Sequence, residues 1–262
     1  MRNPFSVQPD ERPRPVQAAF NYLVVCLLII GFFWVSLMQV GVALDFGFVG
    51  QYRARIFDGL LLTLQISAGS LVMSLLIGLP VAVGRGSRIL PVRYLCDVYV
   101  KLMRGTPLLA QIYLFFYIVG TAWGVENRLV AGIIILSIFS GAYIAEIVRG
   151  SLNSLDAGQL EAARAVGFTR RQTLRYVVVP QLVSRTLPAL TGQLANMVKD
   201  SSLLSVIAVI ELTQTMQEIS SVTFNLFGTY LFLAGAYLVL TLPIMFASRY
   251  FERRLDYAHE DR

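Results

Sequence analysis

Residues 156–180 read DAGQLEAARAVGFTRRQTLRYVVVP, a polar stretch set between long apolar tracts. Asp156 can accept hydrogen bonds from the first free amides of a helix that runs through Leu160–Val166. Gly167 then supplies the left-handed residue that commonly ends such a helix. Thr169-Arg-Arg-Gln172 has the spacing of a capping box and opens a second helix. The stretch therefore predicts two short helices joined by a glycine turn, which form a compact knob.

The knob carries small alanines on its first helix and arginines on both helices. A helix that lies on lipid headgroups normally presents bulky Leu, Phe or Trp side chains to the acyl boundary. Small side chains instead allow another protein surface to approach closely. The sequence therefore favours a knob that docks a protein over an interfacial helix pair that lies on lipid.

The composition of the 262-residue chain is that of a membrane protein. Hydrophobic residues make up 56% of it and charged residues only 15%, with a mean hydropathy of +0.63. A soluble domain normally carries about a quarter charged residues. The formal net charge of +6 would suggest nucleic acid in a soluble protein, but membrane proteins gather Lys and Arg in cytoplasmic loops. We therefore expect the lipid bilayer, and no nucleic acid, as a partner.

Apolar tracts long enough to cross a hydrocarbon core of about 30 Å recur along the chain. They predict six spans, at about 20–44, 58–84, 96–120, 128–148, 177–198 and 226–248. The first tract exceeds the roughly 7–15 apolar residues of a cleaved signal peptide, so we expect it to remain as a span. Residues 1–19 are polar and are predicted to form a disordered cytoplasmic arm.

The stretch 177–213 is too long for one crossing of roughly 20 residues. The polar run Lys199–Ser202 interrupts it. We therefore expect one span that ends near Met197, followed by a shorter helix of about 203–216 on the outer side. Pro180 lies where the first turn of that span is expected, and the first turn of a helix tolerates proline.

The distribution of arginine sets the expected orientation, because cytoplasmic loops carry an excess of positive charge. With the N-terminus inside, the inner segments hold 15 arginines and the outer segments hold three. The inner ones are Arg2, Arg12, Arg14, Arg85, Arg88, Arg93, Arg149, Arg164, Arg170, Arg171, Arg175, Arg249, Arg253, Arg254 and Arg262, and the outer ones are Arg53, Arg55 and Arg128. An even number of spans then places both termini in the cytoplasm.

Charged residues inside or beside the spans are candidates for function, because each costs roughly 2.5–3.5 kcal/mol on insertion scales. Gly105 and Pro107 predict a local helix break next to Arg104, and the freed carbonyls must find partners or line a cavity. Glu146 can pair with Arg149 three residues later, or it can face the pathway. A ladder of Arg93, Asp97 and Lys101 at i, i+4 spacing is expected to be structural.

Lys199–Ser202 combines both signs of charge with two hydroxyls at an expected helix break. Broken helices in transporters supply hydrogen-bond donors and acceptors near the midplane. The run can bind the headgroup of an amino acid, or Lys199 and Asp200 can neutralise each other at a subunit interface. The candidate pathway residues are Arg104, Thr106, Glu146, Lys199, Asp200, Ser201 and Ser202.

The chain lacks the residues of an enzyme. Its only histidine, His259, lies in the polar C-terminal tail, which leaves no His-based metal site or Ser/His catalytic pair in the spans. No G-x-x-x-x-G-K-[ST] sequence is present, so ATP that drives transport must bind another chain. We therefore predict no catalytic residue, no metal and no cofactor on this chain.

The motif Glu161-Ala-Ala163, Gly167 and Val177-x-Val179-Pro180 resembles the EAA loop of ABC importer permeases, although family members usually carry Ile and Leu where this chain has Val177 and Val179. The resemblance extends from about Gly59 to Leu255. It includes Gly59-Leu-Leu-Leu-Thr-Leu, Arg104-Gly-Thr-Pro-Leu-Leu, Ala142-Tyr-Ile-Ala-Glu-Ile-Val-Arg-Gly150 and Lys199-Asp-Ser-Ser-Leu-Leu-Ser205. Together these features are similar to the polar amino acid permeases, which import histidine, glutamine, glutamate, arginine and opines.

The resemblance implies an all-α, polytopic helical membrane protein, a type I ABC importer permease with a five-span core plus one N-terminal transmembrane helix. The expected layout is an arm at 1–19, the additional helix at 20–44, the permease domain at 56–252 with a cytoplasmic coupling loop at about 149–176, and a cytoplasmic tail at 253–262. The loop motif assigns contact with the ATPase to Glu161, Ala162, Ala163, Arg164, Gly167 and Arg170.

The expected partners follow from the same resemblance. They are cytoplasmic ATPase subunits that bind ATP and magnesium, a periplasmic amino-acid-binding protein, and a second permease subunit that is either identical or paralogous. The implied function is import of polar amino acids across the bacterial inner membrane by alternating access, and Lys199–Leu203 with Glu211-Leu-Thr213 favours the glutamine and glutamate type. The alternative is a stand-alone, ion-coupled secondary amino acid transporter, which would need neither the EAA loop nor an ATPase.

Overall fold

The computed structural model describes residues 14–41 and 44–260, with side chains of the last helix described as far as Glu252. All regular elements in these ranges are helices, which confirms the all-α prediction. The chain divides into two units, Met1–Phe46 and Gly47–Arg262. The first unit contains one long helix, α1 (Pro15–Val40), which ends at Gly41 with a left-handed φ of +68°.

The start of α1 corrects the predicted N-terminal arm. Residues 15–19 are helical, and the helix begins at Pro15 because the fixed φ of proline suits a first helical turn. The earlier part of the arm, residues 1–13, lies outside the described residues. The predicted span at 20–44 is otherwise matched by α1, none of whose side chains is buried.

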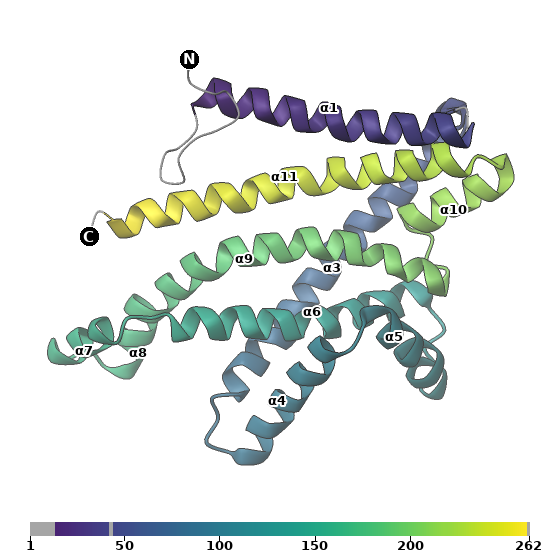
Figure 1. Cartoon of the computed structure of the whole chain (residues 1–262). Coiled ribbons are helices and arrows are strands. Elements are labelled where there is room, and N and C mark those ends of the chain that lie inside the picture. The colour runs from purple at the N-terminus through teal and green to yellow at the C-terminus, as the bar shows by residue number, and fades with distance from the viewer. Residues whose placement is uncertain (1–13, 42–43, 261–262) are drawn as a thin grey trace. The chain divides into compact units, whose positions relative to one another are not determined.

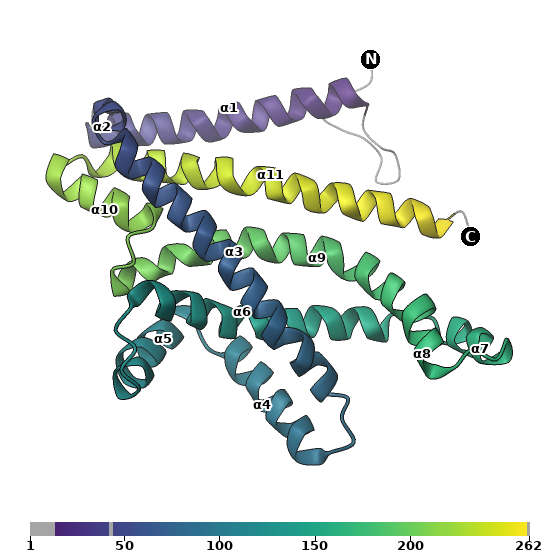
Figure 2. The ribbon, with the colours of Figure 1, turned by 180° about the vertical axis from the view of Figure 1, so that it is seen from behind.

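The second unit is a set of helices that Figures 1 and 2 show from opposite sides. In chain order they are α2 (Gly47–Gln51), α3 (Arg53–Gly84), α4 (Leu90–Gly105), α5 (Leu108–Tyr113), the π-helix η1 (Leu114–Gly120), α6 (Arg128–Asn153), α7 (Ala157–Ala165), α8 (Arg170–Thr173), the π-helix η2 (Leu174–Val178), α9 (Val179–Asp200), the 3₁₀-helix η3 (Ser201–Ile207), α10 (Leu212–Thr223) and α11 (Leu226–Glu260).

Four helices in the described part of the chain, α1, α3, α6 and α11, are long and apolar enough to cross a membrane. Two bent arrangements also qualify when each is taken as one span. The first joins α4 to α5 and η1 at an angle of 112°, and the second joins the helical run 170–207 to α10 at 51°. Counted in this way the spans agree with the predicted six.

α6 lies at the centre of the second unit, and α3 crosses it obliquely (Figure 2). Small residues allow this close crossing, because a Cβ atom at Gly78 would lie 2.7 Å from the Gly141 carbonyl oxygen and 2.8 Å from Ile144 Cγ2. Buried serines fill the same contact, and Ser70 Oγ of α3 donates to the Ile133 carbonyl of α6 at 3.3 Å. Close packing of small and hydroxylated residues is the usual means of joining helices in lipid.

The elements of the second unit gather toward two ends (Figures 1 and 2). The connection between α3 and α4, the helices α7 and α8, and the end of α11 lie toward one end. α5, η1 and α10 lie toward the other. Segments that the arginine distribution assigns to the same side of the membrane therefore lie at the same end of this unit.

Several predicted boundaries are wrong because helices continue through polar residues. α6 continues to Asn153, into the predicted loop at 149–176. The backbone is also helical from Arg170 to Asp200, so α9, which has Pro180 in its first turn as predicted, continues the preceding helix without a break. The π-helix η2 ends at Val178, two residues before Pro180, which has no amide hydrogen to donate. α11 likewise extends the helical backbone through residue 260, into the predicted tail.

The predicted helix break at Lys199–Ser202 is also wrong. α9 includes Asp200 and continues directly as the 3₁₀-helix η3. The chain turns at Ala208, whose φ of +54° is left-handed, and the following helix spans Leu212–Thr223 where 203–216 was expected. The serine hydroxyls satisfy helix carbonyls locally, so the polar run does not interrupt the helix.

Candidate coupling knob and ionic cluster

The first helix of the knob, α7, is closed at both ends as predicted. The Asp156 side chain accepts a hydrogen bond from the Gly158 amide at 2.8 Å. Past the other end, Gly167 has a φ of +80°, and the Phe168 amide donates to the Ala163 carbonyl at 3.0 Å. Glycine adopts this φ without the steric cost that other residues incur. The predicted start and stop of α7 are therefore confirmed.

The second helix begins with the predicted capping box. The Gln172 amide donates to Thr169 Oγ1 at 3.3 Å, and the Thr169 amide donates to Gln172 Oε1 at 2.8 Å. Gln159 follows Asp156 by three residues, as Gln172 follows Thr169, but its side chain does not complete a capping box. Its Oε1 accepts a hydrogen bond from Gln181 Nε2 at 2.5 Å. This contact joins α7 to α9 across 22 residues of sequence.

A second contact joins α9 to the residue that follows α6. Arg185 Nη1 donates to the Ser154 hydroxyl at 2.8 Å and also to the Ser154 carbonyl. Gln181 and Arg185 together therefore connect α9 to the first turn of α7 and to the residue that leads from α6 into the knob. The sequence pattern did not reveal these two links. The one signal was a charged side chain, Arg185, within an apolar stretch, where an intramembrane charge needs a partner.

The residues predicted to contact an ATPase lie mostly on the outside of the knob. Ala163 is 5% exposed and packs inward. The other five, which are exposed, are Glu161, Ala162, Arg164, Gly167 and Arg170. Val166 is 72% exposed and Phe168 39% exposed beside them. The knob therefore presents small, charged and apolar side chains together on one accessible surface.

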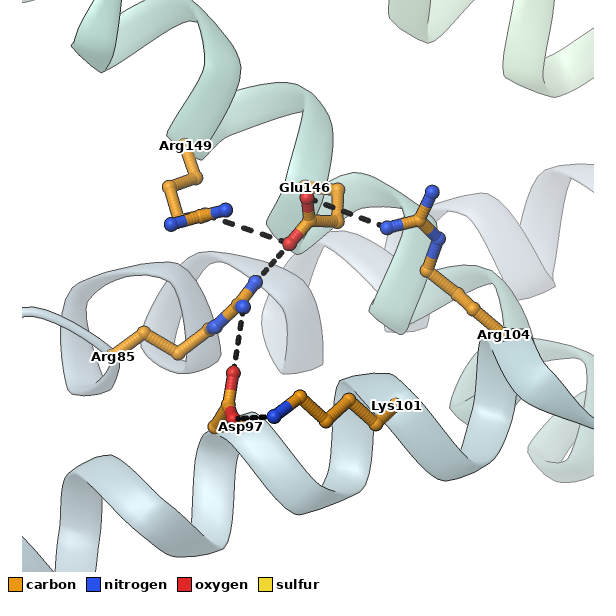
Figure 3. Close-up of polar contacts among 6 residues, drawn as sticks. All are labelled: Arg85, Asp97, Lys101, Arg104, Glu146 and Arg149. Carbon is orange, nitrogen blue, oxygen red and sulfur yellow. Dashed lines mark hydrogen bonds and ion pairs between the residues drawn. The ribbon is translucent and has the colours of Figure 1, made fainter.

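A cluster of ion pairs joins the end of α3 to α4 and α6 (Figure 3). Glu146 on α6 is its centre, because Oε1 accepts from Arg85 and lies 3.5 Å from Arg149 Nε, while Oε2 lies 3.3 Å from Arg104 Nη1. Arg85 Nη2 also donates to Asp97 Oδ1 at 2.8 Å. The cluster thereby connects three helices through two carboxylates.

The ion pair with Arg149 that the sequence offered as one interpretation of Glu146 is formed. Arg104 is also anchored, because its guanidinium lies 5.4 Å from the centre of the Tyr143 ring. The predicted ladder is half right. Asp97 pairs with Lys101 at 2.7 Å, and its second partner is Arg85.

Arg85 lies just beyond the end of α3 and bridges the two carboxylates. Burial by itself lowers the pKa of Arg85, but hydrogen bonds and charge attraction from Glu146 and Asp97 outweigh it and raise the pKa above its usual value. The guanidinium therefore stays charged and holds α4 against α6.

The predicted helix break near Arg104 is confirmed at Thr106 and Pro107. Gln111, which is 3% exposed, compensates for it. Its Nε2 donates to the Met103 carbonyl at 2.8 Å and approaches Thr106 Oγ1 at 2.7 Å and the Thr106 carbonyl at 3.2 Å. The freed carbonyls thus find a partner, as low-dielectric surroundings require. No feature of the sequence pattern pointed to Gln111.

The two serine hydroxyls of the run Lys199–Ser202 donate to carbonyls of the preceding turn, and the Ser201 side chain also has a hydrogen bond with the Tyr237 side chain of α11. Ser201 Oγ donates to the Val198 carbonyl at 2.8 Å, and Ser202 Oγ donates to the Lys199 carbonyl at 2.6 Å. Lys199 is exposed, and among the described residues neither it nor Asp200 forms an ion pair within 4 Å. The structure brings Arg104 and Glu146 together, while this run lies on α9 and η3.

Glu211 is a fully buried carboxylate at the start of α10. From the sequence it was only part of a motif that favoured glutamine or glutamate as the substrate. Its two oxygens accept from the amides of Thr213 at 2.8 Å and Gln214 at 2.9 Å. The Tyr237 hydroxyl of α11 donates to it at 2.9 Å. Thr63 Oγ1 of α3 accepts the remaining Leu212 amide at 3.1 Å. α10 is therefore fixed to both α3 and α11.

Comparison with known proteins yields close relatives. Residues 74–257 match the family described as binding-protein-dependent transport system inner membrane component. The chain is 37% identical over 199 residues to a protein of Bacillus subtilis named "Probable glutamine ABC transporter permease protein", with 76% of this chain and 92% of the relative covered. It is 36% identical over 203 residues to the glutamine transport system permease protein of Escherichia coli, again with 76% and 92% covered.

A solved structure, described as an amino acid ABC transporter with histidines, has the same fold with a TM-score of 0.76. It is 36% identical to this chain and covers 81% of this chain and 100% of that one. An apolar helical bundle with an exposed two-helix knob defines the membrane component of a transport system. The chain belongs to the family of binding-protein-dependent transport system inner membrane components, and it is a permease subunit of an ABC importer.

Membership of this family excludes the stand-alone secondary transporter. The chain is a multi-pass transport subunit, and in such systems the ATPase is a separate chain. The EAA-type motif of α7 agrees with this result, because a stand-alone secondary transporter would have no need of it.

Proposed function

We propose that this permease moves a polar amino acid of the glutamine type across the bacterial inner membrane by alternating access. The glutamine permeases among its relatives support this substrate class. Its partners are two cytoplasmic ATPase subunits, which hold ATP and magnesium, a periplasmic amino-acid-binding protein, and a second permease subunit that is identical or paralogous. No cofactor is held by this chain.

Both termini lie in the cytoplasm in this proposal. The arginine distribution supports that orientation, as does the arrangement in which the knob and the end of α11 lie toward the same end of the second unit. The permease domain extends over 56–252, preceded by the additional helix at 20–44. The coupling loop of about 149–176 then faces the ATPase.

The observation that carries the mechanism is the pair of contacts from Gln181 and Arg185 of α9 to the knob. Closure of the ATPase dimer displaces α7, and these contacts transmit the displacement to α9. α9 continues without a break into Lys199–Ser202, which we assign to the substrate pathway. Arg104, Thr106 and Glu146 are engaged in contacts between helices, so we assign them to maintaining the fold around that pathway.

Uptake measurements test the coupling assignment. The full transporter is reconstituted in proteoliposomes, with glutamine uptake and ATP hydrolysis measured together. Glu161→Lys and Gly167→Asp should leave insertion intact and lower the glutamine imported per ATP. Normal uptake in both variants would contradict the assignment.

The chain offers matched controls for both substitutions. Glu126→Lys makes the same charge change at an exposed position before α6, at the end away from the knob. Gly124 has a left-handed φ of +66° with no heavy atom within 4 Å of an added Cβ, as at Gly167, so Gly124→Asp imposes the same backbone strain elsewhere. Both control variants should retain coupled uptake.

A further inference from the structure

The connection between α3 and α4 contains a basic pocket that the transport mechanism does not use. It has a volume of about 240 Å³ and is lined by Arg85, Arg93, Tyr94, Asp97 and Arg149. These residues come from the end of α3, the first turns of α4 and the last turns of α6. The pocket therefore lies toward the same end of the unit as the coupling knob (Figure 1).

Two guanidinium groups in this pocket have unused donors. Arg93 has no ion-pair partner within 4 Å among the described residues. Arg149 meets Glu146 only through Nε, at 3.5 Å, which leaves its two terminal amino groups without a partner in the described part of the chain. Paired terminal N–H groups of arginine bind phosphate oxygens with matching geometry.

Positive charge is in excess around the pocket. Five cations, Arg85, Arg93, Lys101, Arg104 and Arg149, surround only two carboxylates, Asp97 and Glu146. Like charges gathered this closely repel one another. An anion bound at the pocket would offset this excess.

An apolar groove of about 670 Å³ adjoins the basic pocket. It is lined mainly by Leu79, Pro80 and Val83 of α3 and by Val92 of α4. Val92 directly precedes Arg93, and Gly84 and Gly86 of the groove flank Arg85 in sequence. Consecutive residues lie about 3.8 Å apart at Cα, so the apolar groove lies close to the basic pocket.

We propose that the basic pocket binds the phosphate of an anionic lipid headgroup, with an acyl chain of the same lipid in the adjoining groove. Basic pockets between helices at the cytoplasmic boundary are known to suit such headgroups. The proposal rests on the proposed function for its cytoplasmic orientation. A free phosphate ion offers the same oxygens but would leave the groove unused.

Native mass spectrometry of the delipidated full chain tests the proposal. Dioleoyl phosphatidylglycerol is titrated against dioleoyl phosphatidylcholine, and inorganic phosphate is added in a separate arm. We expect one phosphatidylglycerol to bind at least about tenfold more tightly than phosphatidylcholine. The Arg93→Gln/Arg149→Gln double variant should lose about tenfold of that affinity. Arg88→Gln, in the same connection but outside the pocket, should bind as the wild type does.

Equal binding of the two lipids, or unchanged binding by the double variant, would overturn the proposal. Binding of inorganic phosphate that depends on Arg93 and Arg149, with no preference for phosphatidylglycerol, would identify a site for the free ion and would also overturn it. Thermal unfolding of each variant checks that it is folded. Because the assay requires neither ATPase nor uptake, its result is independent of whether the chain couples to an ATPase.

Discussion

The contacts from α9 to the knob yield the most specific prediction. Replacing Gln181 with Leu and Arg185 with Met removes the donors to Gln159 and Ser154 while keeping side chains of similar size. Neither change reaches the outer surface of α7, so binding of an ATPase should be retained. The knob should instead move independently of α9.

The magnitude follows from the contacts that are lost. A hydrogen bond contributes about 0.5–1.5 kcal/mol net, and these contacts are partly exposed, which favours the lower half of that range. The two side chains make three such bonds, which together contribute roughly 1.5–3 kcal/mol to the attachment of the knob. Because 1.4 kcal/mol is a factor of about ten, the detached knob should become roughly 10–150 times more populated.

Glutamine imported per ATP hydrolysed, measured in proteoliposomes with the full transporter, is the appropriate assay. The double variant should hydrolyse ATP but import several-fold less glutamine per ATP. Thr191→Val is the matched control, because Thr191 of α9 donates only to the Leu187 carbonyl of its own helix. An unchanged ratio in the double variant would refute the transmission of motion through Gln181 and Arg185.

Three further predictions concern helix packing and helix ends within the second unit. Gly78→Ala should lower the thermal unfolding temperature of the full chain in detergent, because overpacking costs about 1–3 kcal/mol. Gly235→Ala should not lower it, because no atom lies within 4 Å of the new Cβ. Equal unfolding temperatures for the two variants would contradict the close α3–α6 contact. Gln111→Leu should destabilise the chain by about 1–3 kcal/mol in a denaturant titration, because the Met103 and Thr106 carbonyls lose their donor. The same substitution at exposed Gln65 should not destabilise it. An equal loss of stability at Gln65 would argue against Gln111 as the partner of these carbonyls. Glu211→Ala should speed hydrogen exchange at the Thr213 and Gln214 amides by roughly 2- to 30-fold, since loss of a helix cap costs about 0.5–2 kcal/mol. Glu211→Gln should have a smaller effect on the exchange rate. Unchanged exchange in both variants would show that the cap is dispensable.

Local features of the fold could be predicted from the sequence because they depend on neighbouring residues. Asp156, Gly167 and the Thr169–Gln172 box fix α7 and the start of the following helix through contacts within a few residues. The break at Thr106 and Pro107 was predictable for the same reason. Apolar length alone was enough to place the long helices, although not their ends.

The errors in the sequence prediction arise where a polar side chain inside a helix forms its hydrogen bond with the backbone of the same helix. Ser201 and Ser202 donate to carbonyls of the preceding turn, so Lys199–Ser202 does not break α9. The π-turn before Pro180 likewise removes the need for a helix boundary there. Such local solutions do not change the hydropathy pattern.

The missed site residues make contacts between segments far apart in sequence. Gln181 reaches Gln159, and Arg85 reaches Glu146 across 61 residues. No spacing rule links such pairs, because the crossing of α3 with α6 and of α9 with the knob determines them. A charged residue in an apolar tract indicates that the side chain has a partner, but it does not identify which residue that partner is.

Docking of an ATPase on the knob can be tested by affinity purification of the full chain from a mild detergent extract, followed by mass spectrometry of the proteins that accompany it. We expect an ATPase subunit in the wild-type sample and in the Gly124→Asp and Glu126→Lys controls. We expect loss of that subunit when Glu161→Lys and Gly167→Asp are combined. An ATPase that stays bound to this double variant would contradict the assignment of α7 as the docking element, and absence of any ATPase from the wild-type complex would contradict the coupling mechanism itself.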